Sequence, residues 1–569
     1  MLFTLICSAL CLFIGGVASS QGPTAHVEHG AVRGTYMKSV GGRTYSAFRG
    51  IPYARPPVGK HRFKEPVATK PWPGVWDATR YGSLCLQYEF TFDPDDERVI
   101  GDEDCLFINI FTPKTDLTTT GPLLDVFVYI HGGGFSNGAS SYYGANFLMD
   151  HDVVYVTFNY RLGILGFLST EDEVVPGNNG LKDQAAALRW IQRNIAAFGG
   201  NPSRVTISGT SAGGASVHYH YLSPLSRGLF QRGMSFSGSA LLCWAQAEAL
   251  RNKAFKLGDL VGCNHQSSRD LVECLRHRPA RLLVQQFEHF QTWRYNPFTP
   301  FGPTVETAGA EPFISKHPVE IITEGGAQDL PWLTSITSEE GLYPVADFAT
   351  KEDVLKELDD KFPEIAPHLL FYNFTVPRSE HKNVANKIRK FYFKNKPISM
   401  QTVKELTQMA GDRIFVYDIE RAARLMAKAN TSPVYFYKFS YRGKDSQSNF
   451  MSRTDVNLGV SHADDTAYIL DMKFSNTQQT QEDRDMTKLM VDMCINFAKN
   501  GNPTPSDRAI TWKSVESDSE DIDFLHIASS SDVKMDSSVD LGNRRFWDSL
   551  PIAEPQITAF KIPHHSDEL

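Results

Sequence analysis

A serine between two glycines constrains this chain more than any other feature. Residues 209–213 read Gly-Thr-Ser-Ala-Gly, after the β-branched run 204–208 and before a segment that can be helical. A strand, a sharp turn and a helix would expose Ser211 as a nucleophile, and glycines fit where neighbouring chains crowd the backbone. A pattern with three fixed positions, such as G-x-S-x-G, is expected to occur by chance roughly 0.2 times in a chain of this length. The assignment of Ser211 as a nucleophile therefore needs support from other motifs.

Short β-rich runs alternate with segments of helical period, which is typical of a mostly parallel sheet with helices on both faces. Apolar residues at helical spacing from Leu181 to Phe198 predict a helix that stops at the break 199–202, so a βαβ crossover should lead into Ser211. The sequence therefore predicts an α/β-hydrolase fold. The expected buried strands are 126–130, 153–158, 205–207, 331–337 and 434–439.

Other segments give coarser expectations. Residues 349–426 are richer in charge and have a helical pattern, which begins with Thr350 and Asp353 in a capping-box arrangement. We expect this segment to be an insertion that shapes the active-site entrance. The apolar stripe 486–497 predicts a helix packed on the core. The acidic, Ser-rich stretch 514–538 is expected to be a solvated loop.

Composition limits the class of protein. Apolar residues make up 41%, charged residues 21% and aromatic residues 12%, which is ordinary for a globular enzyme with a large core. The length of 569 residues would allow two or three domains, but α/β enzymes with large insertions reach this size, and we expect a single domain over residues 21–563. The net charge of −8, without long runs of either sign, argues against a nucleic-acid partner.

Both ends of the chain have features of a secretory protein. Residues 1–20 are uncharged, and their apolar stretch is too short and too interrupted for a membrane anchor, which needs about 20 apolar residues. We expect a cleaved signal peptide over 1–20 and no later membrane span. The tail 564–569 ends in residues that resemble the K-D-E-L retrieval signal: Ser566, Asp567, Glu568 and Leu569. This favours retention in the endoplasmic reticulum by a retrieval receptor, with secretion as the alternative.

A glycine-rich segment follows the expected strand 126–130. Residues 131–135 read His-Gly-Gly-Gly-Phe. In an α/β-hydrolase such a loop supplies backbone N–H groups to an oxyanion hole, together with the residue after the nucleophile. The predicted donors are therefore Gly133, Gly134 and Ala212. Losing one such donor typically costs about 3 to 4 kcal/mol of transition-state stabilisation.

The base and the acid should follow the serine, because this fold orders its triad as serine, acid and histidine. His462 lies in the small-residue loop 459–465, after the expected strand 434–439. Glu340 closes the strand 331–337, and Glu339 beside it is a rival that spacing alone does not exclude.

Seven motifs in chain order resemble those of type-B carboxylesterases of the cholinesterase superfamily, and the similarity extends from about residue 27 to about residue 550. The closest likeness is to insect non-specific esterases. The motifs are FRGIPYA at 48–54, EDCL at 103–106, HGGGF at 131–135, NYR at 159–161, GTSAGG at 209–214, EEG at 339–341 and GVSH at 459–462.

This resemblance implies the roles of the catalytic residues. It places the acid at Glu340 and the base at His462, which would take the proton of Ser211 as that hydroxyl attacks an ester carbonyl. An acyl-enzyme would form and then be hydrolysed, with no metal or organic cofactor. The expected partners are small carboxylic esters, and Ser211 should react with organophosphate inhibitors.

Six cysteines follow the expected signal peptide, and sequence alone allows fifteen connectivities. The resemblance implies the pairs Cys85–Cys105 and Cys263–Cys274, which leaves Cys243 and Cys494 as buried free thiols. Two sequons, at Asn373 and Asn430, predict glycosylation in a lumenal chain.

The choice of ester rests on departures from family patterns. Cholinesterases hold their cationic substrate over a tryptophan in the first disulfide loop, and the segment 85–105 contains none. Juvenile hormone esterases typically have Gln and Ala where this chain has Thr210 and Gly214. These differences favour a carboxylesterase of broad specificity, with a hormone- or pheromone-specific esterase as the alternative.

Three further alternatives concern function and pocket. A non-catalytic, adhesion-type member of the superfamily would lack part of the triad. A lipase would need a lid with an apolar face, which the sequence does not reveal. Phe298 and Phe301 are candidates for an acyl pocket, with packing as the other interpretation.

Overall fold

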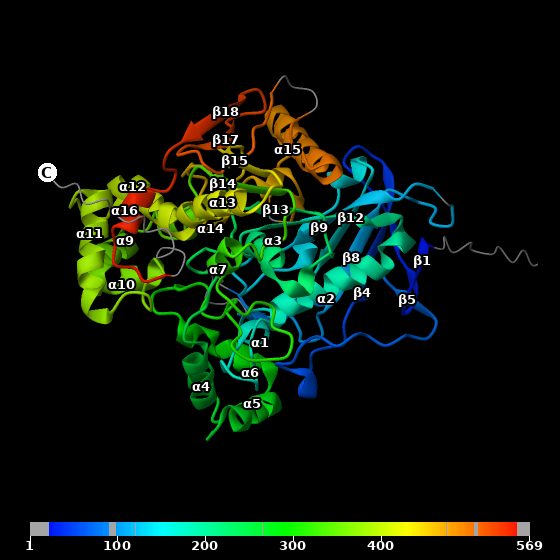
Figure 1. The fold of residues 1–569 in the computed structure, drawn as a ribbon, viewed down its shortest axis with the longest axis horizontal. Helices are drawn as coiled ribbons and strands as arrows, with labels where there is room; N and C mark the ends of the chain where they lie inside the picture. The colour runs from blue at the N-terminus through cyan, green and yellow to red at the C-terminus, as the bar shows by residue number, and fades with distance from the viewer. Residues whose placement is uncertain are drawn as a thin grey trace, which may run out of the picture.

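The computed structural model describes residues 22–89, 98–119, 121–263, 266–473, 475–505 and 510–554. The expected signal peptide 1–20 and the tail 564–569 lie outside these residues. An eleven-stranded sheet runs through the molecule (Figure 1) in the order β18-β17-β15-β14-β13-β12-β9-β11-β8-β4-β3. Its strands are β3 (Thr35–Lys38), β4 (Thr44–Pro52), β8 (Phe107–Thr112), β9 (Leu124–Ile130), β11 (Val153–Phe158), β12 (Gly200–Thr210), β13 (Arg232–Phe236), β14 (Trp332–Thr337), β15 (Val434–Phe439), β17 (Ile522–Ile527) and β18 (Val533–Ser538).

The seven strands from β11 to β17 in this order pair in parallel, and the pairs outside them are antiparallel. Parallel neighbours are joined by crossover connections, which are usually helices, so a largely parallel sheet lies between helices. This arrangement confirms the predicted α/β-hydrolase fold. The helices are α1 (Gly163–Phe167), α2 (Asn179–Asn194), α3 (Ala212–Leu222), α4 (Leu250–Leu260), α5 (Ser268–His277), α6 (Ala280–Gln285), α7 (Pro318–Thr323), α8 (Leu342–Val345), α9 (Glu352–Asp360), α10 (Phe362–Leu369), α11 (His381–Phe393), α12 (Val403–Gly411), α13 (Tyr417–Ala429), α14 (Gln447–Ser452), α15 (Gln481–Asn500) and α16 (Arg544–Asp548).

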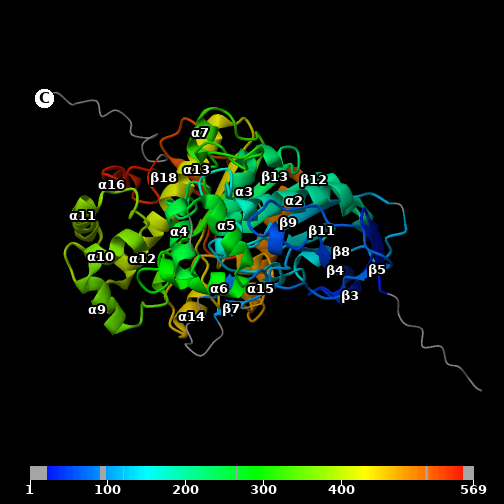
Figure 2. The ribbon, with the colours of Figure 1, turned by 90° about the horizontal axis from the view of Figure 1, so that it is seen from below.

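Two hydrophobic cores lie on opposite faces of the sheet. Along β9, Val126 and Val128 belong to the core under α2 and α3, whereas Phe127 and Tyr129 belong to the core under α15. Figure 1 shows α15 above the strands and α2 below them, and Figure 2 shows the molecule from the side of α2. Because successive strand residues point to opposite faces, a strand covered on both sides reads as a continuous apolar run.

The predicted crossover into Ser211 is confirmed, with one difference at its end. The helix is α2, which continues as a 3₁₀ turn over Ile195–Phe198, and β12 then begins at Gly200. Residues 200–202, which read as part of a break, therefore form the start of the strand.

Two sequence predictions are wrong. The stretch 514–538, expected to be a solvated loop, contains β17 and β18, and Ile522 and Leu525 are fully buried. Most of the acidic and serine residues lie just before β17 and in the turn between the two strands, so the average composition of the stretch hid the buried strand positions. The capping box at Thr350 is absent, because α9 begins at Glu352 with Lys351 as an N-cap that makes no side-chain bond.

The helical block predicted at 349–426 forms α9 to α13, and α9 to α12 gather at one end of the molecule (Figure 1). The disulfides are Cys85–Cys105 and Cys263–Cys274, and Cys243 and Cys494 are buried thiols, as the resemblance implied. Asn373 and Asn430 are both half-buried. Within the residues that the structure describes, no helix combines the length and apolarity needed to cross a bilayer.

Candidate active site

Ser211 lies on a sharp turn between β12 and α3. Its backbone has φ +60° and ψ −122°, a strained conformation for a residue with a side chain. The flanking glycines are required by crowding, because a Cβ atom at Gly209 would lie 2.7 Å from the carbonyl oxygen of Ile130, and one at Gly213 would overlap the same oxygen. The turn therefore raises Ser211 above the carboxyl end of the sheet, as the motif predicted.

His462 and Glu340 meet in a buried contact. The Nδ1 atom of His462 lies 2.6 Å from Oε2 of Glu340, and the two residues are 6% and 1% exposed. The other carboxylate oxygen, Oε1, accepts hydrogen bonds from the backbone N–H of Thr337 at 2.7 Å and from the hydroxyl of Ser237 at 2.5 Å. Nε2 of His462 has no hydrogen-bond partner among the described residues. This leaves one imidazole nitrogen oriented by a carboxylate and the other available to a reacting group.

Glu339 occupies a different place from its neighbour. Its carboxylate oxygen Oε2 accepts bonds from the backbone N–H of Val460 at 2.7 Å and the hydroxyl of Ser338 at 2.6 Å. Glu339 thus binds the backbone of the histidine loop, while Glu340 binds the histidine itself. Sequence spacing did not distinguish Glu339 from Glu340 as the partner of His462. The contacts in the structure do distinguish them, because only Glu340 binds the imidazole.

The histidine loop and the serine turn touch through a pair of threonines. The hydroxyl of Thr210, next to Ser211, lies 2.6 Å from that of Thr466, four residues after His462. The hydroxyl of Tyr129 also donates to Thr210, at 3.1 Å. These buried contacts bring together segments that are about 250 residues apart in sequence, and no local pattern pointed to them.

The glycine-rich loop lies against the serine turn. A Cβ atom at Gly132 would be 3.2 Å from Cβ of Ser211. Gly133 and Gly134 have φ values of +110° and +58°, which suit residues without a side chain. In the described part of the chain, neither glycine donates its N–H to a backbone hydrogen bond, whereas the carbonyl of Gly133 accepts bonds from Ser136 and Asn137.

The N–H of Ala212 completes this set, because Ala212 is the first residue of α3 and the first N–H groups of a helix lack intrahelical partners. His131 is a structural residue beside the loop. Its Nδ1 atom lies 2.9 Å from the carbonyl oxygen of Gly132, and its ring stacks on Tyr160 at 4.4 Å. Burial lowers the pKa of His131 to about 4, so its imidazole is neutral.

A serine on a strained turn, N–H groups without a backbone acceptor in the described chain and a carboxylate-bound histidine together suit ester hydrolysis. The model of the carboxylesterase family matches residues 21–547. The chain belongs to the carboxylesterase family. It is a carboxylic-ester hydrolase, and the non-catalytic alternative is therefore not supported.

Related carboxylesterases span almost the whole chain. Venom carboxylesterase-6 of Apis mellifera is 44% identical over 98% of this chain and 100% of its own length. Esterase E4 of Myzus persicae is 45% identical over 87% of this chain and 90% of its own. The crystal structure of juvenile hormone esterase from Manduca sexta, with OTFP covalently attached, matches with a TM-score of 0.81 at 28% identity and covers 92% of this chain and 99% of that one.

Aromatic side chains surround the histidine of this carboxylesterase. The ring of Phe415, from the helical block, stacks on His462 with centroids 4.2 Å apart, and Tyr343 lies 5.6 Å from the same ring. Phe298 contacts Tyr343 at 5.2 Å and Phe371 at 4.9 Å. Sequence reasoning missed Tyr343 and Phe415, since a single aromatic residue in a helical segment reads as core.

The two phenylalanines proposed for an acyl pocket differ in position. Phe298 borders the glycine-rich loop, because a Cβ atom at Gly134 would lie 3.2 Å from its ring. Phe301 instead packs between Phe290 and Phe287, with ring centroids at 4.9 and 6.2 Å. Of the two, Phe298 is the one for which a contact with the glycine-rich loop of this carboxylesterase is seen.

Proposed function

We propose that Ser211, His462 and Glu340 act as a catalytic triad. His462 takes the proton of the Ser211 hydroxyl through Nε2 as the oxygen attacks the ester carbonyl. Glu340 holds the imidazole in the tautomer with the proton on Nδ1 and stabilises the cation that forms. The alcohol leaves with the proton from Nε2, and water then hydrolyses the acyl-enzyme by the same route. Neither step requires a metal or an organic cofactor.

The backbone N–H groups of Gly133, Gly134 and Ala212 bind the oxyanion of each tetrahedral intermediate in this proposal. Two observations support this role. The glycine-rich loop lies against Ser211, and the N–H groups of Gly133 and Gly134 have no backbone acceptor in the described chain. Donors fixed in advance of the reaction stabilise developing charge without reorganisation, and each is worth about 3 to 4 kcal/mol.

The observation that carries the proposal is the buried pair of His462 and Glu340, with Nε2 unpartnered within the described residues. The test is hydrolysis of p-nitrophenyl acetate by purified mature protein and by Ser211→Ala. We expect Ser211→Ala to lower kcat at least about 1,000-fold. Ser203→Ala, at an exposed position of the same strand, serves as the control and should retain full activity. Activity of Ser211→Ala within tenfold of the parent protein would overturn the triad.

We further propose broad specificity for small carboxylic esters. Support comes from the identities of 44 and 45% to proteins named carboxylesterase and esterase, compared with 36% to juvenile hormone esterase of Tribolium castaneum and 28% to the juvenile hormone esterase structure. Hormone-ester hydrolysis is the second candidate, because that structure matches over 92% of the chain. A kinetic panel of acyl and alcohol sizes, with a choline ester and a terpenoid ester included, distinguishes the two. A kcat/KM for the terpenoid ester about 100-fold above all others would favour the second candidate.

Reaction with organophosphates follows from the same nucleophile. A phosphorus ester mimics the carbonyl centre, so Ser211 should become covalently phosphorylated and the enzyme inactive. Mass spectrometry of the tryptic peptide that contains Ser211 gives the readout. Label found on another residue, with full loss of activity, would contradict the assignment of the nucleophile.

We propose that the chain matures in the secretory pathway. Its two disulfides form in oxidising compartments, which supports this location. Retention in the endoplasmic reticulum through residues 566–569 is tested by deleting them in a eukaryotic cell that expresses the protein. The deletion should send the enzyme into the medium. An unchanged distribution would show that no retrieval receptor reads the tail.

Glycosylation of Asn373 and Asn430 is the remaining proposal on maturation. Removal of N-glycans with an endoglycosidase should lower the mass of the parent protein. The decrease should be larger than the decrease seen for either single Asn→Gln variant. The side-chain nitrogen of Asn430 donates to the carbonyl oxygen of Gln328 at 3.4 Å, so a glycan there would replace the other hydrogen of that nitrogen. Equal masses before and after treatment would exclude both sites.

A further inference from the structure

Gln87 is a buried polar side chain close to the first disulfide. It lies in the two-residue strand β6 (Gln87–Tyr88), which pairs with β7 (Val99–Ile100), and it is 2% exposed. Its Nε2 atom donates to the carbonyl oxygens of Cys85 at 2.8 Å and of Gly138 at 3.1 Å. Its Oε1 atom accepts the N–H of Gly138 at 2.7 Å. One amide therefore binds both backbone polar groups of Gly138 and joins them to a disulfide-bonded cysteine.

Gly138 in turn lies against the glycine-rich loop. Its φ is +110°, and a Cβ atom there would be 2.5 Å from the carbonyl oxygen of Gly132 and 2.8 Å from Nδ1 of His131. The preceding residue, Asn137, has its carbonyl oxygen packed so closely on Gly133 that a Cβ atom on that glycine would overlap it. A displacement of Gly138 would therefore be passed directly to Gly132 and Gly133.

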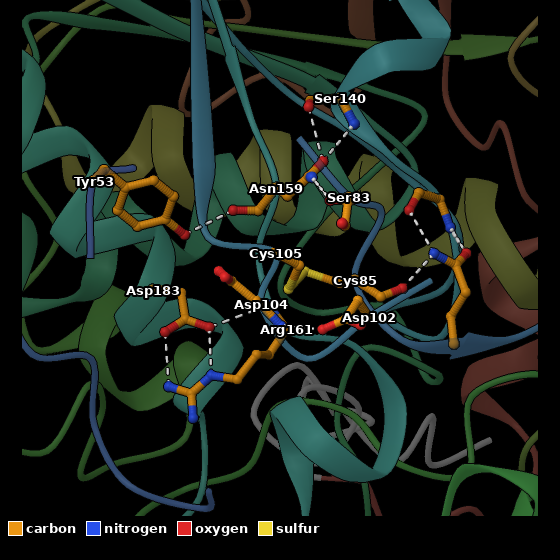
Figure 3. Close-up of a disulfide and its surroundings, with 12 residues drawn as sticks. Tyr53, Ser83, Cys85, Asp102, Asp104, Cys105, Ser140, Asn159, Arg161 and Asp183 are labelled. Atoms are coloured by element: carbon orange, nitrogen blue, oxygen red, sulfur yellow. Dashed lines mark hydrogen bonds and ion pairs between the residues drawn. A yellow bond between two sulfur atoms is a disulfide. The ribbon is translucent and has the colours of Figure 1, made fainter. Parts of the chain in front are cut away.

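A second amide fastens the same segment two residues later (Figure 3). Oδ1 of Asn159 accepts bonds from the backbone N–H of Ser140 at 3.0 Å and from its hydroxyl at 2.8 Å. Nδ2 of Asn159 donates to the carbonyl oxygen of Ser83 at 2.9 Å. Figure 3 shows Asn159 between Ser140 and Ser83, close to the Cys85–Cys105 disulfide. The segment 138–140 is thus tied at both ends to residues 83–87.

We propose that Gln87 is a positioning residue for the oxyanion loop and that it acts through Gly138. This inference rests on the proposed role of Gly133 and Gly134 as oxyanion donors. Three consecutive glycines have more backbone freedom than any other tripeptide, so their N–H groups converge only if something outside the loop holds it. The Gln87 amide does this with three hydrogen bonds, anchored at a cysteine that the disulfide keeps in place.

Such a role predicts a specific kinetic pattern. Donors that bind the oxyanion act in the transition state and bind the ground-state ester weakly, so their displacement lowers kcat with little change in KM. A misplacement of about 1 Å can cost about 100-fold in rate. A side chain that served only for packing would lower stability and leave kcat unchanged.

The experiment compares Gln87→Met with Gln192→Met. Methionine matches the length of glutamine but cannot form these hydrogen bonds. Gln192 is a matched control because its Nε2 atom also donates to two backbone carbonyls, of Pro202 and Leu229 at 2.8 Å each, outside the oxyanion loop. We expect Gln87→Met to lower kcat for p-nitrophenyl acetate at least about 10-fold, with KM within about threefold, and Gln192→Met to lower only Tm.

A transition-state analogue supplies the second readout. A trifluoromethyl ketone adds reversibly to the serine as a tetrahedral oxyanion, so its inhibition constant should rise by the factor by which kcat/KM falls. If Gln87→Met does not fold, Gln87→Asn takes its place, since its amide is one methylene too short to reach Gly138. Failure of both variants to fold would make Gln87 a residue required for folding and would overturn the positioning role.

A kcat within twofold of the parent protein, or equal losses in the Gln87 and Gln192 variants, would also overturn the inference. Failure of the underlying function is a separate result. Full activity of Ser211→Ala would disprove the triad whatever the Gln87 variants did. An inactive Ser211→Ala alongside an unchanged Gln87→Met would leave the triad intact and reject only the role of Gln87.

Discussion

His462 and Glu340 face each other because they follow neighbouring parallel strands of the sheet. Glu340 comes three residues after β14 ends, and His462 lies after α14 in the connection that follows β15. The backbone N–H of Glu339 donates to the carbonyl of Val460 at 3.1 Å, so the two loops pair before any side chain is considered. The 2.6 Å contact between Nδ1 of His462 and Oε2 of Glu340 is thus a consequence of sheet topology.

Glu340→Gln should lower kcat about 1,000- to 10,000-fold, because the amide no longer favours the imidazole tautomer with the proton on Nδ1 or stabilises its cation. Glu339→Gln is the matched control, since a glutamine oxygen can still accept the N–H of Val460. We expect that variant to lose less than about tenfold. Steady-state rates on p-nitrophenyl acetate give the comparison. Equal losses in the two variants would contradict the assignment of Glu340 as the acid.

Phe298→Ala should change acyl selectivity, because it removes a ring that borders the oxyanion loop. We expect the ratio of kcat/KM for p-nitrophenyl hexanoate to that for acetate to rise roughly 10-fold. Phe301→Ala removes a ring of equal size that packs on Phe290, and its selectivity should stay that of the parent protein. The prediction fails if both variants show the same ratio.

The two disulfides should differ in their effect on catalysis. Each disulfide closes a short loop: its two cysteines are separated by 20 residues in Cys85–Cys105 and by 11 in Cys263–Cys274. The chain-entropy model gives about 3 kcal/mol of stability for each bond. Double alanine variants should therefore lower Tm by similar amounts. Only loss of Cys85–Cys105 should also lower kcat, because this bond anchors Gln87. Thermal melts and rates at 25 °C measure the two effects, and equal kcat values would contradict the link.

Asp412 should make stability depend on pH. It is 5% exposed, and its Oδ2 atom accepts bonds from Tyr392 at 2.8 Å and Asn543 at 2.6 Å. Burial raises its pKa from 3.8 to about 7. The folded protein therefore binds the proton more tightly than the unfolded chain, and the stability contributed by this group falls as pH rises from about 4 to about 7.

Asp412→Asn should remove this dependence, because the amide is neutral at every pH and its oxygen can accept the same hydrogen bonds. Between pH 5 and pH 8 the Tm of the parent protein should fall by roughly 2 °C more than that of the variant. Differential scanning calorimetry at both pH values measures the difference. A parallel shift of the two proteins would show that Asp412 is already ionised at pH 5.

Local patterns predicted the elements around Ser211 well. β12, the elbow and α3 are contiguous in sequence, so a β-branched run and two glycines were enough to predict them. The strands β17 and β18 were missed for the opposite reason. Both strands are short and lie beside an acidic, Ser-rich loop and turn, so buried Ile522 and Leu525 are outnumbered in any window average by acidic and serine residues.

The partners of Ser211 were harder to predict because they come from distant parts of the chain. Choosing Glu340 over Glu339 needed a family resemblance, since the separations of the two glutamates from His462 differ by a single residue. Phe415 and Gln87 carried no signal at all. Each gains its place from one contact across the fold, Phe415 with His462 and Gln87 with Gly138.

Local sequence patterns were enough to predict the nucleophile elbow, the glycine-rich loop and the α/β class, because each depends on residues next to one another in the chain. Which glutamate reaches His462, which phenylalanine borders Gly134 and what holds the glycine loop in place became visible only in the folded chain. Those contacts depend on the register and twist of the sheet, where a shift of one residue along a strand turns a side chain to the opposite face.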